Sequence, residues 1–454
     1  MKKLFQQPFL NHLKNEPAVS RLFYFSPEAV ILKIMKNLLR KLTPDFLLNW
    51  YHFGWTLLGA IIYRFPSKRL KVIGLTGTNG KSTVVFLISQ ILEEAGYQVA
   101  SLSSIQFKIK DEIQPNTLKM TMPGRLKIQR FLRRAVQGGC QYAVLEVTSE
   151  GIKQNRHQFI DFETALLTNL TAEHLESHGS FENYRKAKGR LFQKVGPKGK
   201  MIVNLDDPSA DYFLQFPAEE KWGYSLGVQA QIKNIVQAEN CQSNQKGVSF
   251  LVRGINFDLN LLGRFNIANA LAAITVGLVE EIPLAKIKLA LEKVKGLPGR
   301  LEIVIREPYT VIVDYAHTPD ALEKVYQTIR EIFPGRLIGL LGAAGGGRDK
   351  WKRPQLGRMA EKYLDKIIIT NEDPYDEEPQ AIIDQVAAGL KQKPAQKILN
   401  RRQAIQRALK IAQKGDVVII TGKGCEPWIC VEEGEKIPWD DRQVVKEEFN
   451  KLSS

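Results

Sequence analysis

From residue 71 onward, short apolar runs alternate with stretches in which apolar residues recur every three or four positions. The run KVIGLT at residues 71–76 predicts a buried strand, and residues 82–96 predict an amphipathic helix that ends at Gly96. The alternation continues, with strands expected at residues 98–104, 142–147 and 164–170 and a helix at residues 181–192. This pattern predicts an α/β fold with a doubly wound parallel sheet.

A second series begins near Leu301 and predicts a second doubly wound unit. Its strands are expected at residues 310–315, 336–343, 366–370 and 416–421, with helices between them. Between the two series, residues 222–262 are polar and strand-like, as in an edge or lid, and residues 266–279 predict a helix packed on small residues. Pro298 and Gly299 in LPGR indicate a hinge. We therefore expect a central domain over residues 71–300, a Rossmann-like domain over 301–454, and a short, mainly helical region over 1–70.

The N-terminal region contains the apolar segment FLLNWYHFGWTLLGAIIYRF at residues 46–65. Asn49 and His52 interrupt it, and basic residues flank it on both sides, at Arg40, Lys41, Lys68, Arg69 and Lys71. Three interpretations stay open: a buried or docking helix of a soluble protein, a helix lying in a membrane interface, and a bilayer span. The region up to residue 71 therefore offers a possible peripheral contact with a membrane.

The net charge of +16 favours anionic partners such as nucleotides or acidic lipid. It is uneven, because residues 1–71 hold twelve lysines and arginines against three acidic residues. Nucleic acid is not expected as a partner, since basic and aromatic residues are not interleaved in binding motifs. The four cysteines have no metal-ligand spacing, and the N-terminus has no secretion signal. These features predict a cytoplasmic protein, with the inner face of the membrane as a possible location.

The junction IGLTGTNGKST, at residues 73–83, has the composition of a phosphate-binding loop. Gly77 and Gly80 allow the backbone to approach phosphate oxygens, and the amides at the start of the following helix favour negative charge. Lys81 can meet the β- and γ-phosphates, and Ser82 or Thr83 can bind Mg²⁺. Leu75 stands where the common P-loop has glycine, and the alternative is a plain strand-to-helix turn.

Candidate metal ligands follow two other strands. Glu146 ends a buried strand, where a carboxylate can hold Mg²⁺, although a buried structural carboxylate is the alternative. His174 and His178 are four residues apart, but no third ligand has zinc spacing, so a phosphate or Mg²⁺ contact of His174 is expected. Lys188, taken by itself, is interpreted as a solvated lysine beside Lys186 and Arg190 on a basic helix.

Eight stretches together resemble the Mur ligases, and most closely the MurE-type UDP-N-acetylmuramoyl-tripeptide synthetases of peptidoglycan synthesis. They occur in the family's order over about four fifths of the chain: TGTNGKST, LEVTSEGIKQNR, TNLTAEHLESHGSFENYRKAKGRLF, LLGRFNIANALAA, LPGRLE, VDYAHTPDAL, GGGRDKWKRP and TGKGCE. The resemblance implies an ATP-dependent ligase that joins an amino acid to a muramoyl-peptide. ATP phosphorylates the peptide carboxylate, and the amine displaces phosphate from the acyl phosphate through a tetrahedral intermediate.

The resemblance also implies the roles of individual residues. The expected catalytic residues are Lys81, Glu146, His174 and Lys188, with Lys188 carbamylated by CO₂ and two Mg²⁺ ions held by Ser82, Glu146, His174 and the carbamate. The expected ATP contacts are Gly77, Thr78, Asn79, Gly80, Lys81, Ser82, Thr83, Asn266, Asn269, Arg300, Asp314 and His317. The expected contacts to the peptide substrate are Thr121, Pro123, Thr148, Gln154 and Arg156, and those to the amino acid are Arg348, Asp373, Tyr375, Gly422 and Glu426.

Some of these assignments have structural alternatives. Asn266 could cap a helix, and Asp314 could stabilise a turn. The chain also departs from the family at the amine site, where diaminopimelate-adding members have Asp-Asn-Pro-Arg and this sequence has Glu372, Asp373, Pro374 and Tyr375. Loss of the arginine removes a carboxylate fork, so lysine or another diamine is expected rather than diaminopimelate.

The second departure concerns the N-terminus. MurE-type enzymes have a folded domain of roughly a hundred residues that holds the UDP group, whereas about seventy basic and apolar residues precede the phosphate loop here. UDP is therefore held differently, or the substrate is anchored otherwise, for example to a lipid. The rival functions are a folylpolyglutamate synthetase-like ligase, another cell-wall amide ligase, and a nucleotide-dependent scaffold without catalysis. A monomer is expected.

Overall fold

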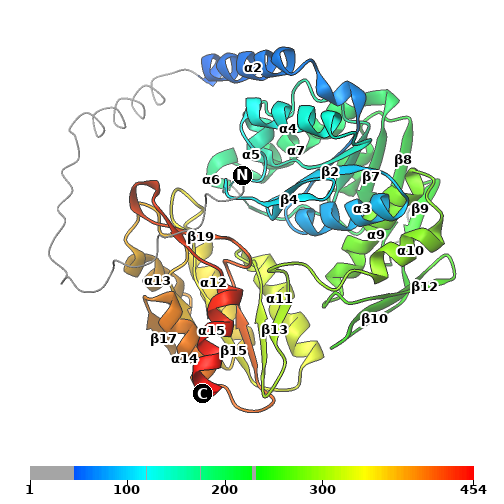
Figure 1. The fold of residues 1–454 in the computed structure, drawn as a ribbon. Coiled ribbons are helices and arrows are strands. Elements are labelled where there is room, and N and C mark those ends of the chain that lie inside the picture. Colours follow the sequence, from blue (N-terminus) through cyan, green and yellow to red (C-terminus); the bar gives the residue numbers. More distant parts are fainter. Residues whose placement is uncertain (1–44, 119, 174, 228–231, 454) are drawn as a thin grey trace, which may run out of the picture. The chain divides into compact units, whose positions relative to one another are not determined.

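The computed structural model describes residues 45–118, 120–173, 175–227 and 232–453. The chain divides into two compact units, Met1–Tyr51 and His52–Ser454. Helix α2 (Asp45–Ile62) crosses this division, and the second unit contains two large sheets with their helices (Figure 1).

The first sheet has nine strands, in the order β4-β3-β2-β5-β1-β6-β7-β8-β9. Their bounds are β1 (Lys71–Thr76), β2 (Val99–Leu102), β3 (Gln106–Ile109), β4 (Glu112–Pro115), β5 (Tyr142–Glu146), β6 (Thr164–Leu167), β7 (Lys200–Asn204), β8 (Glu220–Ser225) and β9 (Asn234–Gln237). All neighbouring pairs are parallel except those made by β3 and β4, which form an antiparallel hairpin at one edge. Strand β1 lies between β5 and β6, so the carboxyl ends of these three strands meet at a topological switch point.

Helices cover both faces of this sheet, because alternate side chains of its buried strands point to opposite sides (Figure 1). One face packs on α3 (Lys81–Glu94), α9 (Phe265–Val279) and α10 (Leu284–Glu292). The other packs on α4 (Arg125–Gln137), α5 (Ser149–Lys153), α7 (Phe181–Val195) and α8 (Ala210–Leu214). The 3-10 turn η1 (Pro66–Arg69) leads into β1, and α6 (Leu175–His178) precedes α7.

The described part of residues 222–262 contributes strands to two different sheets. Strands β8 and β9 extend the main sheet, with β9 at its edge. The remainder forms a three-stranded antiparallel sheet of β10 (Glu239–Asn244), β11 (Gly247–Val252) and β12 (Ile255–Leu259), whose apolar side chains join the core around α9.

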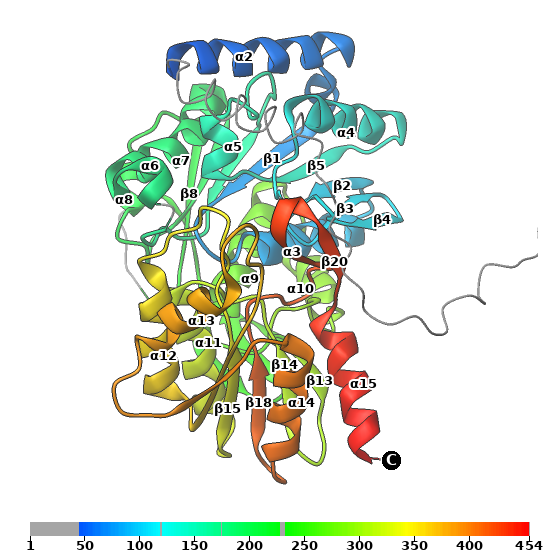
Figure 2. The ribbon, with the colours of Figure 1, turned by 90° about the vertical axis from the view of Figure 1, so that its left-hand side faces the viewer.

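The second large sheet has six strands, in the order β13-β14-β18-β15-β16-β17. Their bounds are β13 (Glu302–Ile305), β14 (Thr310–Val313), β15 (Leu337–Leu341), β16 (Lys366–Thr370), β17 (Ala395–Ile398) and β18 (Val417–Ile420). One face is covered by α11 (Pro319–Ile332), α12 (Lys352–Tyr363) and α13 (Pro379–Ala387), and the other by α14 (Arg401–Ile411) and α15 (Asp441–Ser453), as Figure 2 shows. The hairpin of β19 (Trp428–Cys430) and β20 (Lys436–Pro438) completes this half. The α/β fold class is thus confirmed for both series.

The described residues contain no helix that is both long enough and apolar enough to cross a membrane. This contradicts the bilayer span that residues 46–65 left open, because the polar residues Asp45, Asn49 and His52 interrupt the apolar residues of α2.

Candidate active site

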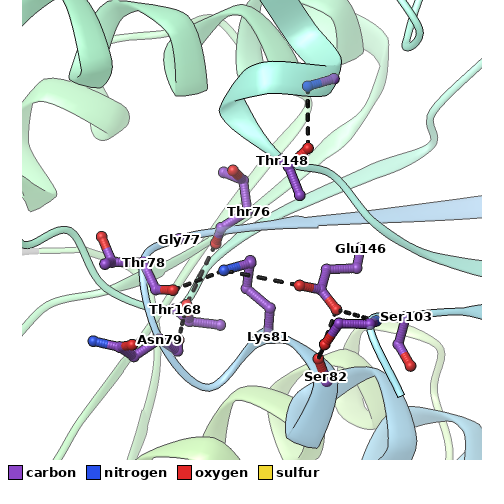
Figure 3. Close-up of polar contacts among 12 residues, drawn as sticks. Thr76, Gly77, Thr78, Asn79, Lys81, Ser82, Ser103, Glu146, Thr148 and Thr168 are labelled. Atoms are coloured by element: carbon purple, nitrogen blue, oxygen red, sulfur yellow. Dashed lines mark hydrogen bonds and ion pairs between the residues drawn. The ribbon is translucent and has the colours of Figure 1, made fainter. Parts of the chain in front are cut away.

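The phosphate-loop sequence forms the connection from β1 to α3 at the switch point of the nine-stranded sheet (Figure 3). Gly77 and Gly80 both have positive φ, at 151° and 81°. A Cβ atom on Gly77 would lie 2.0 Å from the Thr168 hydroxyl, and one on Gly80 would lie 2.4 Å from the Asn269 side chain. Glycine is therefore required at both positions by conformation and by space.

The loop is held from the neighbouring strand by residues that follow β6. The Thr168 hydroxyl and the Asn169 amide donate to the Asn79 carbonyl at 2.8 and 3.0 Å, and the Asn79 backbone amide donates to Asn169 at 2.9 Å. The Asn79 side chain donates to Asp320 of α11 at 2.8 Å, so it links the loop to the six-stranded half. Thr168, Asn169 and Asp320 were not singled out from the sequence, although TNLT was part of the resemblance.

Lys81, Ser82 and Glu146 form one polar cluster beneath the loop (Figure 3). The Ser82 hydroxyl donates to Glu146 at 2.7 Å, and the Lys81 ammonium lies 3.8 Å from the same carboxylate. Ser104 adds a backbone donor to Glu146 at 3.0 Å. Because a hydroxyl and a carboxylate oxygen are ligands that Mg²⁺ prefers, the pair fits a magnesium ion beside the phosphates.

Lys188 is fully inside the protein rather than on a solvated helix face. Its side chain is 2% exposed, its ammonium donates to the Gly77 carbonyl at 2.6 Å, and it stacks 4.6 Å from the centre of the Tyr184 ring. Burial, together with the nearby Lys81 charge, holds the pKa of Lys188 well below its ordinary value. The interpretation as a solvated lysine is therefore wrong.

A cleft of about 770 Å³ unites most of the predicted site residues. Those that line it are Thr78, Asn79, Gly80, Lys81, Ser82, Thr83, Thr121, Glu146, Thr148, Gln154, Arg156, Asn266, Asn269, Arg300, Asp314, His317, Arg348 and Glu426. Gly77, Pro123, Lys188, Asp373, Tyr375 and Gly422 are not among its lining residues. Both sheets contribute to the cleft, so substrates from the two halves can meet there.

Two asparagines at the start of α9 lie next to the loop. The Asn269 side chain donates to Asn266 at 2.8 Å, and Asn266 donates to the Leu262 carbonyl at 2.8 Å. Asn266 therefore bonds backwards within the chain rather than capping the helix, whose N-cap residue is Arg264. Both amides are buried and lie at the cleft wall.

Asp314 follows β14 and is 5% exposed. Its carboxylate accepts backbone hydrogen bonds from Leu301 at 2.7 Å and Ala316 at 2.6 Å. Burial raises its pKa, while the Arg300 charge acts in the opposite direction. Arg300 stacks 4.4 Å from the centre of the Tyr315 ring. Asp314 thus stabilises a turn, as the structural alternative predicted, and it also lies in the wall of the cleft.

The residues predicted to hold the peptide lie together on the α5 side of the cleft. Thr148 caps α5 by accepting from the Gly151 amide at 3.1 Å. Arg156 donates to Gln154 at 2.7 Å and to the Met122 carbonyl, and burial lowers its pKa. Met122, which replaces a threonine of the family pattern, is buried at 1% exposure.

The amine-side residues divide into two groups. Arg348 and Glu426 line the cleft. Asp373 lies deeper, where the Lys423 ammonium is 2.8 Å from both of its carboxylate oxygens and the Cys430 amide donates at 2.7 Å. Asp373 is therefore paired within the protein. Lys423 belongs to TGKGCE but was not assigned a role from the sequence.

Gly422 and Tyr375 complete the surroundings of this pair. Gly422 has a φ of 105°, and a Cβ atom there would lie 2.3 Å from the Glu372 carboxylate. Burial raises the pKa of Glu372 to about 7. The Tyr375 ring lies against Gly346, where a Cβ atom would be 2.6 Å from the ring.

Of the two histidines predicted as possible metal ligands, the structure describes only His178. His174 lies outside the described residues. His178 lies in α6 with its Nε2 atom 3.5 Å from Glu150. In the parts of the chain that the structure describes, no group of three or more His, Cys, Asp or Glu side chains is placed to hold a metal ion. The zinc alternative includes His174, so the pair of His174 and His178 lies partly outside the described residues.

The comparisons with known proteins cover both halves of this site. Residues 75–277 match the Mur ligase middle domain, and residues 299–424 match the glutamate ligase domain of Mur ligases. A UDP-N-acetylmuramoyl-L-alanyl-D-glutamate–2,6-diaminopimelate ligase of Thermosynechococcus vestitus is 38% identical over 398 residues, which are 86% of this chain and 78% of the relative.

Solved structures agree with this assignment. A structure of a UDP-N-acetylmuramoyl-L-alanyl-D-glutamate–2,6-diaminopimelate ligase has 29% identity and a TM-score of 0.58, covering 85% of this chain and 79% of that one. A folylpolyglutamate synthase of Mycobacterium tuberculosis has a TM-score of 0.66 over 87% of this chain and 96% of that one, but its 16% identity shows a shared fold alone. The chain belongs to the Mur ligase family and is a MurE-like, ATP-dependent ligase.

Proposed function

We propose that this ligase adds a diamino acid to a UDP-muramoyl-dipeptide in peptidoglycan synthesis. One observation supports this most: a single cleft contains the phosphate loop, the Thr148–Arg156 side and the Arg348–Glu426 side. A ligase must bring ATP, a carboxylate and an amine together, and these three sets of residues suit the three substrates. In this assignment residues 71–300 bind ATP and the peptide, and residues 301–454 bind the amino acid.

In the proposed first step, the peptide carboxylate attacks the γ-phosphate and forms an acyl phosphate. Two anions approach each other, so the reaction needs cations and amides that neutralise charge and hold the groups in line. Lys81 and the amides at the start of α3 suit this role, because they lie at the positive end of a helix. Asn266, Asn269, Arg300, Asp314 and His317 are assigned to the nucleotide end.

We also propose Mg²⁺ and a carbamate on Lys188 as cofactors. CO₂ adds only to a neutral amine, and the lowered pKa of Lys188 supplies that form. Addition of CO₂ to the neutral amine would release one proton, and the resulting anion would stand beside the Lys81 ammonium and the Tyr184 ring. Ser82 and Glu146 would hold Mg²⁺, which supplies charge neutralisation at the phosphates.

For the incoming amino acid we favour diaminopimelate, which appears in the names of the similar ligases. The preference for lysine rests on the lost arginine and on the acidic residues Glu372 and Asp373, but Lys423 neutralises the Asp373 carboxylate. Lysine remains the second candidate, because Tyr375 offers one phenolic donor where diaminopimelate-adding members have an arginine. Arg348 and Glu426 are assigned to the α-amino acid end.

The remaining assignments concern setting and assembly. Use of ATP suits a cytoplasmic enzyme, and we propose that it acts as a monomer, since the described cleft is built from one chain. That UDP is held differently from the usual N-terminal domain of the family, or that the substrate is anchored otherwise, stays a prediction.

The test is a turnover assay with the full chain, ATP, Mg²⁺ and UDP-N-acetylmuramoyl-L-alanyl-D-glutamate, across a panel of amino acids. We expect phosphate release that requires both acceptor and amine, with a tripeptide product identified by mass spectrometry. Diaminopimelate should give the highest kcat/KM, followed by lysine. A Lys81→Ala variant serves as the inactive control. Phosphate release without an amine-dependent product, for every amino acid, would overturn the proposal.

A further inference from the structure

The second half of α2 has its large apolar side chains outward. Leu58, Ile61 and Ile62 are 43%, 55% and 55% exposed, whereas Thr56 and Ala60 on the opposite face are fully buried. A surface helix of a water-soluble protein has the reverse arrangement, with its apolar stripe towards the core. This exposed row therefore points to a non-aqueous surface outside the protein.

The outward orientation is fixed by contacts on the inner face. The Thr56 hydroxyl donates to the Asn155 carbonyl at 3.2 Å, and the Phe53 ring packs 5.1 Å from the Phe159 ring. A Cβ atom on Gly59 would lie 3.3 Å from Leu126 of α4, so the two helices approach closely. Rotation of α2 to bury its outer row would break these contacts.

Exposed cations border the apolar row. Arg64, Lys68 and Arg69 follow α2 directly and are all exposed. On α4, which packs against η1, Lys127 and Arg130 are also exposed. Neither residues 52–71 nor residues 125–137 contain an aspartate or glutamate, so no acidic side chain of these segments offsets the positive charge.

We infer that this surface, formed by Leu58, Ile61 and Ile62 with Arg64, Lys68, Arg69, Lys127 and Arg130, docks on a lipid bilayer with anionic headgroups. Helix α2 would lie in the interface with its outer row among the upper acyl chains. Arg64, Lys68 and Arg69 follow the helix directly, and Lys127 and Arg130 lie on α4, which contacts the helix at Gly59. The negative surface potential that would attract them decays over a Debye length of about 10 Å.

A lipid surface explains both the exposed apolar row and the cations beside it, whereas a second copy of the chain explains only the apolar row. A symmetric interface through α2 would place the same cationic surface on both copies, so positive charge would face positive charge around the contact. Such like-charge pairs oppose association, but anionic headgroups satisfy them. The inference goes beyond the ligase chemistry, and it holds whichever amino acid is added.

The test measures sedimentation of the full chain with vesicles of phosphatidylcholine alone and with phosphatidylglycerol added. We expect binding only to the anionic vesicles, weakened by salt. The triple variant L58Q/I61Q/I62Q removes the apolar row, and R64Q/K68Q/R69Q removes the adjacent cations. Each should weaken binding at least about tenfold. Both variants should have the same ligase activity in solution as the wild-type protein, because none of the substituted residues lines the cleft.

Matched controls separate the surface from general hydrophobicity and charge. Leu289→Gln removes an exposed leucine of α10, and K246Q/R253Q/K286Q removes three exposed cations elsewhere. Both should leave the vesicle affinity within about twofold of wild type. The proposal is overturned if wild type does not bind anionic vesicles, or if the two test variants bind as well as their controls. It is also overturned if light scattering finds a wild-type dimer that L58Q/I61Q/I62Q abolishes.

Discussion

The Lys423 ammonium lies 2.8 Å from both carboxylate oxygens of Asp373, in a site where the two side chains are 0% and 7% exposed. Lys423 also donates to Glu426 at 2.7 Å, and Glu426 accepts from the Tyr315 hydroxyl at 3.3 Å. A buried cation thus links Asp373 to a cleft residue. This explains how an aspartate is accommodated at the amine site without presenting a free negative charge to the substrate.

Removal of this cation should be strongly destabilising. Lys423→Met removes the ammonium group that pairs with the buried Asp373 carboxylate and leaves the hydrogen bond from the Cys430 amide in place. We expect the free energy of unfolding, measured by urea denaturation, to fall by about 3–5 kcal/mol. Lys414→Met, at an exposed lysine, should change it by less than about 0.5 kcal/mol. Equal stabilities of the two variants would show that the pair does not contribute.

The contribution of Glu372 to stability should fall as the pH rises from about 4.5 towards 7, opposite in sign to the contributions of His157 and His317, whose pKa values burial lowers to about 4 and 3. The pKa of Glu372 is raised from 4.5 to about 7, because burial disfavours the carboxylate. Between these values the folded protein binds more protons than the unfolded chain, so deprotonation favours unfolding. The Glu372 contribution can reach about 1.4 kcal/mol per pH unit.

Glu372→Gln should flatten this dependence and raise the melting temperature at pH 8 relative to wild type. Glu435→Gln, at an exposed glutamate of the same half, should preserve the wild-type slope. Thermal unfolding at a series of pH values measures both. A slope that persists unchanged in Glu372→Gln would assign the titration to another group.

Gly80 should be intolerant of a side chain for a reason beyond its backbone conformation. Gly80→Ala and Gly139→Ala place a Cβ at similar positive φ values, 81° and 76°. The added atom meets Asn269 at 2.4 Å in the first case, whereas in the second the nearest atom, of Lys110, is 3.9 Å away. Both variants should lose about 1 kcal/mol of stability.

Only Gly80→Ala should lose turnover, on the order of 100-fold, because the loop must move relative to the phosphates. Steady-state kinetics with saturating amino acid measures this difference. Similar kcat values for the two alanine variants would mean that the displaced Asn269 side chain has no part in nucleotide binding.

Ser82 should couple magnesium to catalysis. Ser82→Ala removes the hydroxyl that donates to Glu146 at 2.7 Å and that is the proposed metal ligand. We expect activity to fall about 10- to 100-fold, with a higher Mg²⁺ concentration needed for half-maximal rate. Ser89→Ala, in the same helix, removes only a bond to the Val85 carbonyl and should have a small effect. The metal role is refuted if the Mg²⁺ titration of Ser82→Ala matches that of Ser89→Ala.

The sequence alone determined the features that depend on local chemistry. Buried strands and amphipathic helices follow from side-chain periodicity, and the phosphate loop follows from glycines between a strand and a helix start. The short antiparallel strands β3, β4, β13, β19 and β20 were missed, because half-exposed strands of three or four residues have little periodicity.

Tertiary structure decided which distant residues meet. The Asn79 side chain donates a hydrogen bond to Asp320, which is 241 residues away in the sequence, and Asp373 pairs with Lys423, which is 50 residues away. No local sequence pattern predicts either pairing. Burial also reversed the interpretation of Lys188, since its neighbours in sequence are exposed cations. The sequence specifies the composition of a segment and the spacing of its apolar residues. Only the packing of the whole chain fixes which face of α2 is turned outward and which charges are removed from water, because these depend on contacts between elements.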